Sequence, residues 1–145
     1  MQISNRFTIG IHVLTAIEFF KNEHDITSSF LSSSVGVNPV VIRTVMQDLK
    51  EAGLIKSSQG KTGISLAVPL SKISFYDVYK ALHCIEENEL FHFHDNPNLS
   101  CPVGRNIHKA LDSKLYDIQC AMENKMKEIF VSQVYTDISK ELETI

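Results

Sequence analysis

The sequence contains no tryptophan and only 3 cysteines, 6 glycines and 4 prolines among its 145 residues. The small and odd number of cysteines argues against a framework of disulfide bonds. The low glycine and proline content argues against a collagen-like or low-complexity chain, and the 43% of hydrophobic residues argues against a disordered one. A globular protein of one domain, with at most a small appendage, is the expectation.

Long apolar runs are also missing, because the longest, such as residues 9–11, are only a few residues long. A membrane-spanning helix needs about 20 apolar residues, so no membrane span is expected. The first residues show neither a charged start followed by an apolar core nor a small-residue cleavage site, so we expect no secretion signal. Together with the free thiols, this predicts a cytoplasmic protein.

The sequence also lacks a large excess of charge of either sign, since the net charge is only -3. Residues 1–70 carry six basic and five acidic side chains, whereas residues 71–145 carry eight basic and twelve acidic ones. A polyanion would therefore dock on the first half. An excess of one positive charge is far below the strongly basic surface that would by itself indicate nucleic-acid binding, so charge permits DNA binding without showing it.

The first half has the pattern of a winged helix-turn-helix. Apolar spacing predicts helices over residues 3–20, 27–35 and 39–52, then short strands at 54–55 and 64–68 around a glycine-containing turn. Thr27 is a good N-cap for the second helix, Gly36 suits its left-handed end, and Asn38 with Pro39 suits the start of the third. In this arrangement the third helix enters the major groove and the hairpin reaches the adjacent backbone or minor groove.

The second half begins with a fourth helix predicted over residues 73–87, which contains Cys84, and a loop follows from residue 88 to 100. A long fifth helix then carries an apolar stripe at steps of three and four residues: Ile107, Leu111, Leu115, Ile118, Met122, Met126 and Ile129. Its own domain is too small to cover this stripe, so we expect self-association into a homodimer through these residues. The predicted fold is mainly α-helical with a small β-hairpin wing: a DNA-binding region over 1–70 and a dimerisation region over 71–145.

Several segments in order resemble the bacterial winged-helix repressor family that includes the iron-sulfur cluster regulator, the nitric-oxide-sensitive repressor and the cysteine metabolism repressor. These are residues 3–7, 26–37, 49–55, the wing from Gly60 to Gly63, residues 73–81, and a cysteine-containing loop before the last helix. The resemblance implies a homodimeric transcriptional repressor, not an enzyme, whose affinity for a palindromic operator responds to a signal in that loop.

The resemblance also places the DNA contacts. It implies that the base-reading positions are Asn38, Val40, Arg43, Thr44 and Gln47. Arg43 is the strongest candidate because its guanidinium can donate two hydrogen bonds to guanine, while Ser28 and Ser29 at a helix N-terminus suit phosphate. Many family members place an arginine in the wing where this chain has Gln59, so Lys61 is a candidate for a phosphate contact instead. Polar residues on an exposed helix face are more often merely solvated.

Cluster-binding members of the family carry three closely spaced cysteines in the loop, whereas this chain has only Cys101 there. Cys84 and Cys120 lie at apolar helical positions that favour the core, and Gly104 stands where a ligand histidine is often found. An iron-sulfur cluster needs about four such ligands, so none is expected, and no other cofactor. A thiolate and imidazole metal site remains conceivable from residues His83, Cys84, His92, His94, Cys101 and His108, but their spacing matches no recognised pattern.

Cys101 is the remaining candidate for a sensor. Pro102 follows it, so the thiol is expected at the N-terminus of the fifth helix, where the helix dipole stabilises a thiolate that an oxidant or electrophile could modify. A small cap residue without a chemical role is the alternative.

For the whole protein, the alternative is a winged-helix module that binds proteins and has lost DNA recognition. An enzyme has little support, because phosphate-binding and hydrolase motifs are missing.

Overall fold

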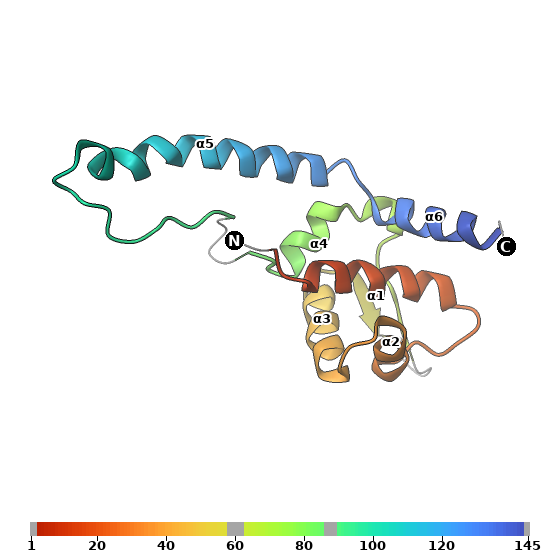
Figure 1. The fold of residues 1–145 in the computed structure, drawn as a ribbon. Helices are drawn as coiled ribbons and strands as arrows, with labels where there is room; N and C mark the ends of the chain where they lie inside the picture. The colour runs from red at the N-terminus through yellow and green to blue at the C-terminus, as the bar shows by residue number, and fades with distance from the viewer. Residues whose placement is uncertain (1–2, 58–62, 86–89, 144–145) are drawn as a thin grey trace.

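The computed structural model describes residues 3–57, 63–85 and 90–143. Its elements, in chain order, are α1 (Arg6–Phe20), α2 (Ser28–Val35), α3 (Pro39–Glu51), β1 (Ile55–Ser57), β2 (Ile64–Leu66), the short 3-10 helix η1 (Leu70–Lys72), α4 (Phe75–Ala81), α5 (Pro102–Met126) and α6 (Val131–Glu143). The predicted fold class is confirmed: the described chain is mainly helical and carries one two-stranded hairpin (Figure 1).

Helix α1 is the centre of the molecule, and eight of its residues are buried. It begins at Arg6, three residues later than predicted. The Ser4 amide instead donates to the carbonyl of Cys84 at 3.2 Å, which holds the chain before α1 against another segment. Gly10 allows α4 to pack closely on α1, since a Cβ atom at this position would collide with the side chain of Leu82. The contact between these two helices therefore depends on a residue without a side chain.

The wing is an antiparallel pair in which Ile55 faces Leu66 and Ser57 faces Ile64. It is fastened to the segment before α2 at the end nearest its turn, because the Ile64 amide donates to the carbonyl of Ile26 at 3.1 Å. The Ala67 amide also donates to the carbonyl of Leu54 at 2.9 Å, which closes the ladder beyond the named strands. The orientation of the hairpin at this end is therefore set by the segment that leads into α2.

Helix α4 is shorter than predicted. A capping box fixes its start, in which the Ser74 hydroxyl accepts from the Asp77 amide at 3.1 Å and the Asp77 carboxylate accepts from the Ser74 amide at 2.9 Å. It ends at Ala81, and His83 adopts a φ of 50°, which breaks the helical path. The prediction that this helix contains Cys84 is therefore wrong, although Cys84 is buried as expected.

The long stripe of the fifth helix is also interrupted. Helix α5 ends at Met126, so the prediction that Ile129 belongs to its stripe is wrong. The carbonyl of Ile129 instead accepts from the Phe75 amide at 2.8 Å, and the Val131 amide donates to the carbonyl of Ile73 at 2.9 Å. After this pairing the chain forms α6, which the sequence patterns did not separate from α5 and which lies along α1 (Figure 1).

The hydrophobic core draws on both sides of residue 70. Its fully buried members include Leu14, Leu31 and Leu49 from the first three helices, and they share one cluster with Val78 of α4 and Val131 of α6. Cys120 is only half-buried on α5, which corrects the prediction that it is a core residue. Among the described helices, none is both long enough and apolar enough to cross a bilayer.

Candidate nucleic-acid interface

Three caps fix the ends of α2 and the start of α3. The Thr27 hydroxyl accepts from the amide of Phe30 at 3.1 Å, and Gly36 ends α2 in the left-handed conformation with a φ of 82°. The Asn38 side chain then accepts from the amide of Val40 at 2.8 Å, with Pro39 in the first helical position. These are the caps that the sequence predicts. They fix the direction in which α3 leaves the turn.

Helix α3 has one buried and one outward face. Ile42, Val45, Met46 and Leu49 are buried against the other helices. The outward face holds the side chains predicted to read bases, which lie at helical spacing: Val40, Arg43, Thr44 and Gln47. Val40 is 57% exposed although it is apolar. The fold thus brings four of the five predicted base-reading side chains onto one solvent-facing surface, with Asn38 at its N-terminal end.

Arg6 is a residue at this surface that the sequence analysis missed. Its guanidinium donates to the Thr44 hydroxyl at 3.3 Å and forms an ion pair with Asp48, so it links the start of α1 to two turns of α3. Its Nε atom also donates to the carbonyl of Leu82 at 3.4 Å, just after α4. The signal that was available is a lone arginine in the first turn of an otherwise apolar helix.

The Thr44 hydroxyl is therefore less available to a DNA base than the exposure of this residue suggests. Its hydroxyl accepts from Arg6 and donates to the carbonyl of Val41 at 2.8 Å, so the methyl group is the part left to contact a base. The Gln47 amide donates to Glu51 at 3.0 Å on the surface, a contact that exchanges readily with solvent or another partner. Arg43 is exposed and, among the residues that the structure describes, makes no side-chain hydrogen bond or ion pair, so its donors face solvent.

Of the remaining predicted DNA contacts, the structure describes only the two serines of α2. Ser28 and Ser29 occupy the first turn of α2, where backbone N–H groups point outward and favour an anion. Gln59 and Lys61 lie outside the described residues. Strand β1 of the wing is nevertheless tied to α3, because the Lys50 ammonium donates to the Ser57 hydroxyl at 2.9 Å.

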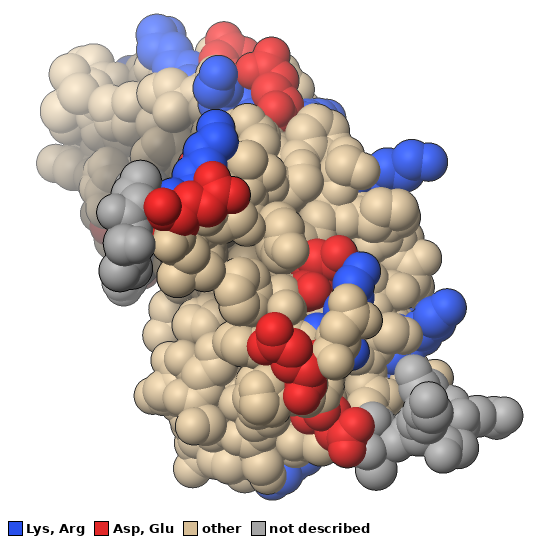
Figure 2. All heavy atoms as spheres, turned by 90° about the vertical axis from the view of Figure 1, so that its right-hand side faces the viewer, with Lys and Arg blue, Asp and Glu red and all other residues tan. Residues whose placement is uncertain are grey.

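The electrostatic surface is mixed. On the face drawn in Figure 2, Lys and Arg side chains are interspersed with Asp and Glu side chains, and large areas are uncharged. A field of one sign over such a face is therefore weak. Residues 1–70 carry only one more basic than acidic side chain, so recognition of DNA by this chain would depend more on individual side chains of α3 than on a general attraction.

The segment before α5 places Cys101 at the helix N-cap, as predicted, with Pro102 in the first turn. The thiol is half-buried, and the Cys101 amide donates to the carbonyl of Asn98 at 3.1 Å. Gly104 makes this loop possible, because a Cβ atom there would collide with the carbonyl of Asn98. A histidine at position 104 would thus displace the loop, which gives a steric reason for the glycine.

The donor set does not fit an iron-sulfur cluster or a mononuclear metal ion. Within the described ranges, no three His, Cys, Asp or Glu side chains converge as a metal site would require. Cys84 is buried in the winged-helix core, where burial raises the pKa of its thiol to about 11, and the Arg6 charge opposes this rise. His108 packs against His94 and Phe93 with ring centroids 5.1 and 4.7 Å away, and its Nε2 donates to the carbonyl of His94. These histidines therefore serve the packing of the loop on α5.

The predicted dimer stripe lies on a helix that has no buried residue in the chain. Ile118 is 53% exposed, whereas the following members are half-buried: Ile107, Leu111, Leu115, Met122 and Met126. Met122 and Met126 pack against the core, so the C-terminal end of α5 is attached to the winged helix and the N-terminal part extends away from it (Figure 1). The exposed part of the stripe can therefore contact another surface.

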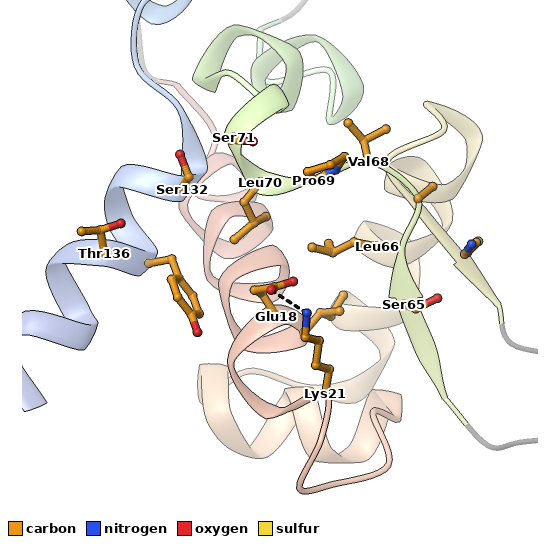
Figure 3. A pocket seen from close by; sticks show the side chains of 14 residues that line it. Glu18, Lys21, Ser65, Leu66, Val68, Pro69, Leu70, Ser71, Ser132 and Thr136 are labelled. Atoms are coloured by element: carbon orange, nitrogen blue, oxygen red, sulfur yellow. Dashed lines mark hydrogen bonds and ion pairs between the residues drawn. The ribbon is translucent and has the colours of Figure 1, made fainter.

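A hollow of about 710 Å³ opens between α1, β2 and α6 (Figure 3). Its polar groups are mainly hydroxyls, from Ser65, Ser132 and Thr136 among others, above apolar side chains such as Leu70. At one edge the Lys21 ammonium donates to Glu18 at 2.8 Å, a hydrogen bond that raises the pKa of Lys21. No imidazole or thiol lines this hollow, so its described lining lacks the usual nucleophile and base pair of hydrolases.

Comparison with known proteins identifies the family. Residues 3–137 match the model of Rrf2, described as an iron-dependent transcriptional regulator. A relative from Bacillus subtilis (strain 168), named as the HTH-type transcriptional regulator YwnA, is 38% identical over 124 residues, which are 86% of this chain and 90% of that protein. A second one, YwgB from the same organism, is 26% identical over 129 residues and covers 88% of this chain and 80% of that protein.

Solved structures agree with this assignment. A crystal structure described as that of a DNA-binding protein is 31% identical, covers 89% of this chain and 97% of its own, and has a TM-score of 0.69. T. potens IscR, at 18% identity, shares the fold with a TM-score of 0.67 over 95% of this chain and 88% of its own. CymR of B. subtilis, at 14% identity, also shares it with a TM-score of 0.67 over 94% of this chain and 97% of its own.

The suspected family resemblance is thus confirmed over most of the chain, and with it the prediction that the protein is not an enzyme. The chain belongs to the Rrf2 family of transcriptional regulators.

Proposed function

We propose that this protein is a cytoplasmic, homodimeric repressor that binds a palindromic operator. The observation that carries the proposal is the outward face of α3, where Val40, Arg43 and Gln47 are exposed beside a capped turn. Asn38 and the methyl group of Thr44 complete the base-reading set. Ser28 and Ser29 contact phosphate through the first turn of α2, and the wing adds Gln59 and Lys61.

The dimer forms through the exposed stripe of α5. A two-fold axis across this helix would pair the same apolar residues of two copies, as closed symmetry requires. It would also present two copies of α3 to successive major grooves, whose separation on one face of B-DNA is about 34 Å. A palindromic operator follows from that symmetry.

Selection of duplexes from genomic DNA at low salt tests the proposal. The wild-type protein is expected to enrich a palindrome, and Arg43→Ala is expected to weaken specific binding by about 1–3 kcal/mol, because a bidentate contact to guanine is lost. Arg105→Ala, a change of the same charge on exposed α5, is the control and should bind as the wild type does. Failure to enrich any duplex, together with capture of one protein partner in stoichiometric amount, would support the protein-interaction module instead.

Cys101 is the thiol through which the repressor senses oxidants. With hydrogen peroxide, the sulfur of the thiolate attacks one oxygen, the O–O bond breaks, and a sulfenic acid and hydroxide form. Support comes from the position of Cys101, half-buried at the N-cap of α5. Peroxide is expected to change operator affinity in the wild type and in Cys120→Ser but not in Cys101→Ser. An equal response of all three proteins would contradict this sensing role.

A further inference from the structure

A chain of polar contacts joins residues 90–101, the segment that carries Cys101, to the winged helix. The Tyr79 hydroxyl of α4 donates to the Glu123 carboxylate of α5 at 2.9 Å. The Gln119 side chain donates to the same carboxylate oxygen at 3.2 Å, and its carbonyl accepts from the Leu90 amide at 2.9 Å. Tyr79 is only 2% exposed and Leu90 only 7%. A buried polar group without a hydrogen bond costs free energy. Glu123 pairs the Tyr79 hydroxyl and Gln119 pairs the Leu90 amide, so the two residues avoid this cost together.

The same end of α5 is attached to the winged helix by further contacts. The Lys127 ammonium lies 4.6 Å from the centroid of the Tyr76 ring. The backbone of Ile129 pairs with Phe75, and that of Val131 pairs with Ile73. In Figure 1 the rest of α5 extends away from the other helices. Residues 119–131 therefore form the junction between a projecting arm and the DNA-binding unit.

The contacts continue from this junction to the base-reading helix. Arg6 donates to the carbonyl of Leu82, immediately after α4, and its guanidinium also binds Thr44 and Asp48 of α3. Gly10 lets Leu82 pack tightly on α1. A shift of α4 relative to α5 would hence move α1 and α3 with α4, because the Arg6 bonds and the close packing at Gly10 join these three helices.

The required displacement is small. Helix α5 has 25 residues, which at about 1.5 Å per residue gives an arm of roughly 37 Å. A change of about 5° at the junction moves the far end by roughly 3 Å, close to the 3.4 Å rise of one base pair. Two recognition helices spaced for one operator would then lose their register on it.

We infer that Gln119 and Glu123 are positioning residues that couple the segment carrying Cys101 to the angle between α5 and the winged helix. The inference rests on the proposed function and names its regulation. Gln119 holds the beginning of the segment at Leu90, Glu123 holds α4 through Tyr79, and the shared carboxylate oxygen joins the two. A rearrangement of the segment releases Gln119 and changes the contact that sets the angle.

The test uses the full-length dimer and the duplex selected with the wild-type protein. Gln119→Met keeps the size of the side chain and removes its amide, while Asn124→Ala, on the exposed surface of the same helix, is the control. We expect Gln119→Met to accelerate amide hydrogen exchange at Leu90 and to change operator affinity about tenfold, with the dimer intact and the control unchanged. Tyr79→Phe and Glu123→Gln should each change operator affinity, and the double variant should change it no more than either alone.

Two outcomes separate the inference from the proposed function. If the wild-type protein binds its duplex and Gln119→Met binds it within twofold while Leu90 exchanges faster, the coupling role is wrong and the repressor remains. Additive effects of Tyr79→Phe and Glu123→Gln on operator affinity would also overturn the coupling. If the wild-type protein enriches no duplex, the proposed function fails, and the inference fails with it.

Discussion

The winged helix and helix α5 differ in how much of their apolar surface the chain itself covers. In the winged helix, Leu14, Ile42 and Leu49 are completely buried. On α5 no residue is buried, and Tyr116 and Ile118 are 63% and 53% exposed. Burial of apolar area is the main source of folding free energy, so the winged helix is stabilised within one chain. Helix α5 gains much less from burial within the chain, which is why we propose that a second copy covers its apolar stripe.

The largest expected effect is on stability, from truncating the core. Leu49→Ala should lower the free energy of unfolding by about 2–5 kcal/mol at every protein concentration, because it leaves a cavity among buried helices. Leu111→Ala on α5 should act mainly through the dimer, so its effect should depend on protein concentration. Urea unfolding at two concentrations measures both. Equal, concentration-independent losses would remove the distinction between the two regions.

The next effect concerns association. Ile118→Glu should weaken the dimer by at least about 100-fold, because the two-fold axis would bury a carboxylate from each copy without a partner. Sedimentation equilibrium measures the change, and Asp117→Ala, at the neighbouring exposed position, is the control. A dimer that withstands Ile118→Glu would show that the exposed stripe has another purpose.

A smaller effect is expected where α1, α3 and α4 meet. Arg6→Met keeps the aliphatic stem but removes the bonds to Leu82, Thr44 and Asp48, and it should cost about 1–2 kcal/mol of stability. Lys21→Met breaks only the exposed pair with Glu18 and should cost less than about 0.5 kcal/mol. Thermal unfolding compares the two variants. Indistinguishable melting temperatures would mean that Arg6 does not hold the winged helix together.

The effect that is smallest at neutral pH comes from the Cys84 thiol, through the pH dependence of stability. Burial raises the pKa of Cys84 to about 11 from an ordinary value of 9.0, so between pH 9 and 11 the unfolded thiol ionises while the folded one remains protonated. Stability should therefore be unaffected by this group at neutral pH and fall with rising pH in this window, by up to about 2–3 kcal/mol at its alkaline end. Cys84→Ala should flatten the decline, whereas Cys120→Ala should retain it. An unchanged slope in Cys84→Ala would contradict the burial of this thiol.

Local signals predicted the helix-turn-helix well. Thr27, Gly36 and Asn38 act as caps within four residues of their partners, so the chemistry of each terminus is visible in the sequence. The outward face of α3 was likewise predictable, because Val40, Arg43 and Gln47 follow the helical period on the side opposite to the apolar stripe. Whether these residues bind DNA stays a prediction.

Contacts between residues far apart in the sequence set the helix ends that the apolar patterns did not predict. The apolar period of α5 continues to Ile129, but pairing of Ile129 with Phe75, more than fifty residues earlier, ends the helix and allows α6 to pack on α1. Helix α4 stops early for a similar reason, since Cys84 pairs with Ser4 across the molecule. These partners cannot be identified from the residues next to each helix end.

By itself, the sequence determined the helical fold with its wing, the capped turn, the outward face of α3 and the position of Cys101 at a helix N-terminus. These features depend on neighbours within one or two helical turns, where residue type and spacing suffice. Only the tertiary structure decided the end of α5, the separate α6, the role of Arg6 and the Tyr79, Glu123 and Gln119 contacts. Each of these joins residues far apart in the chain, and their meeting depends on the packing of the whole core.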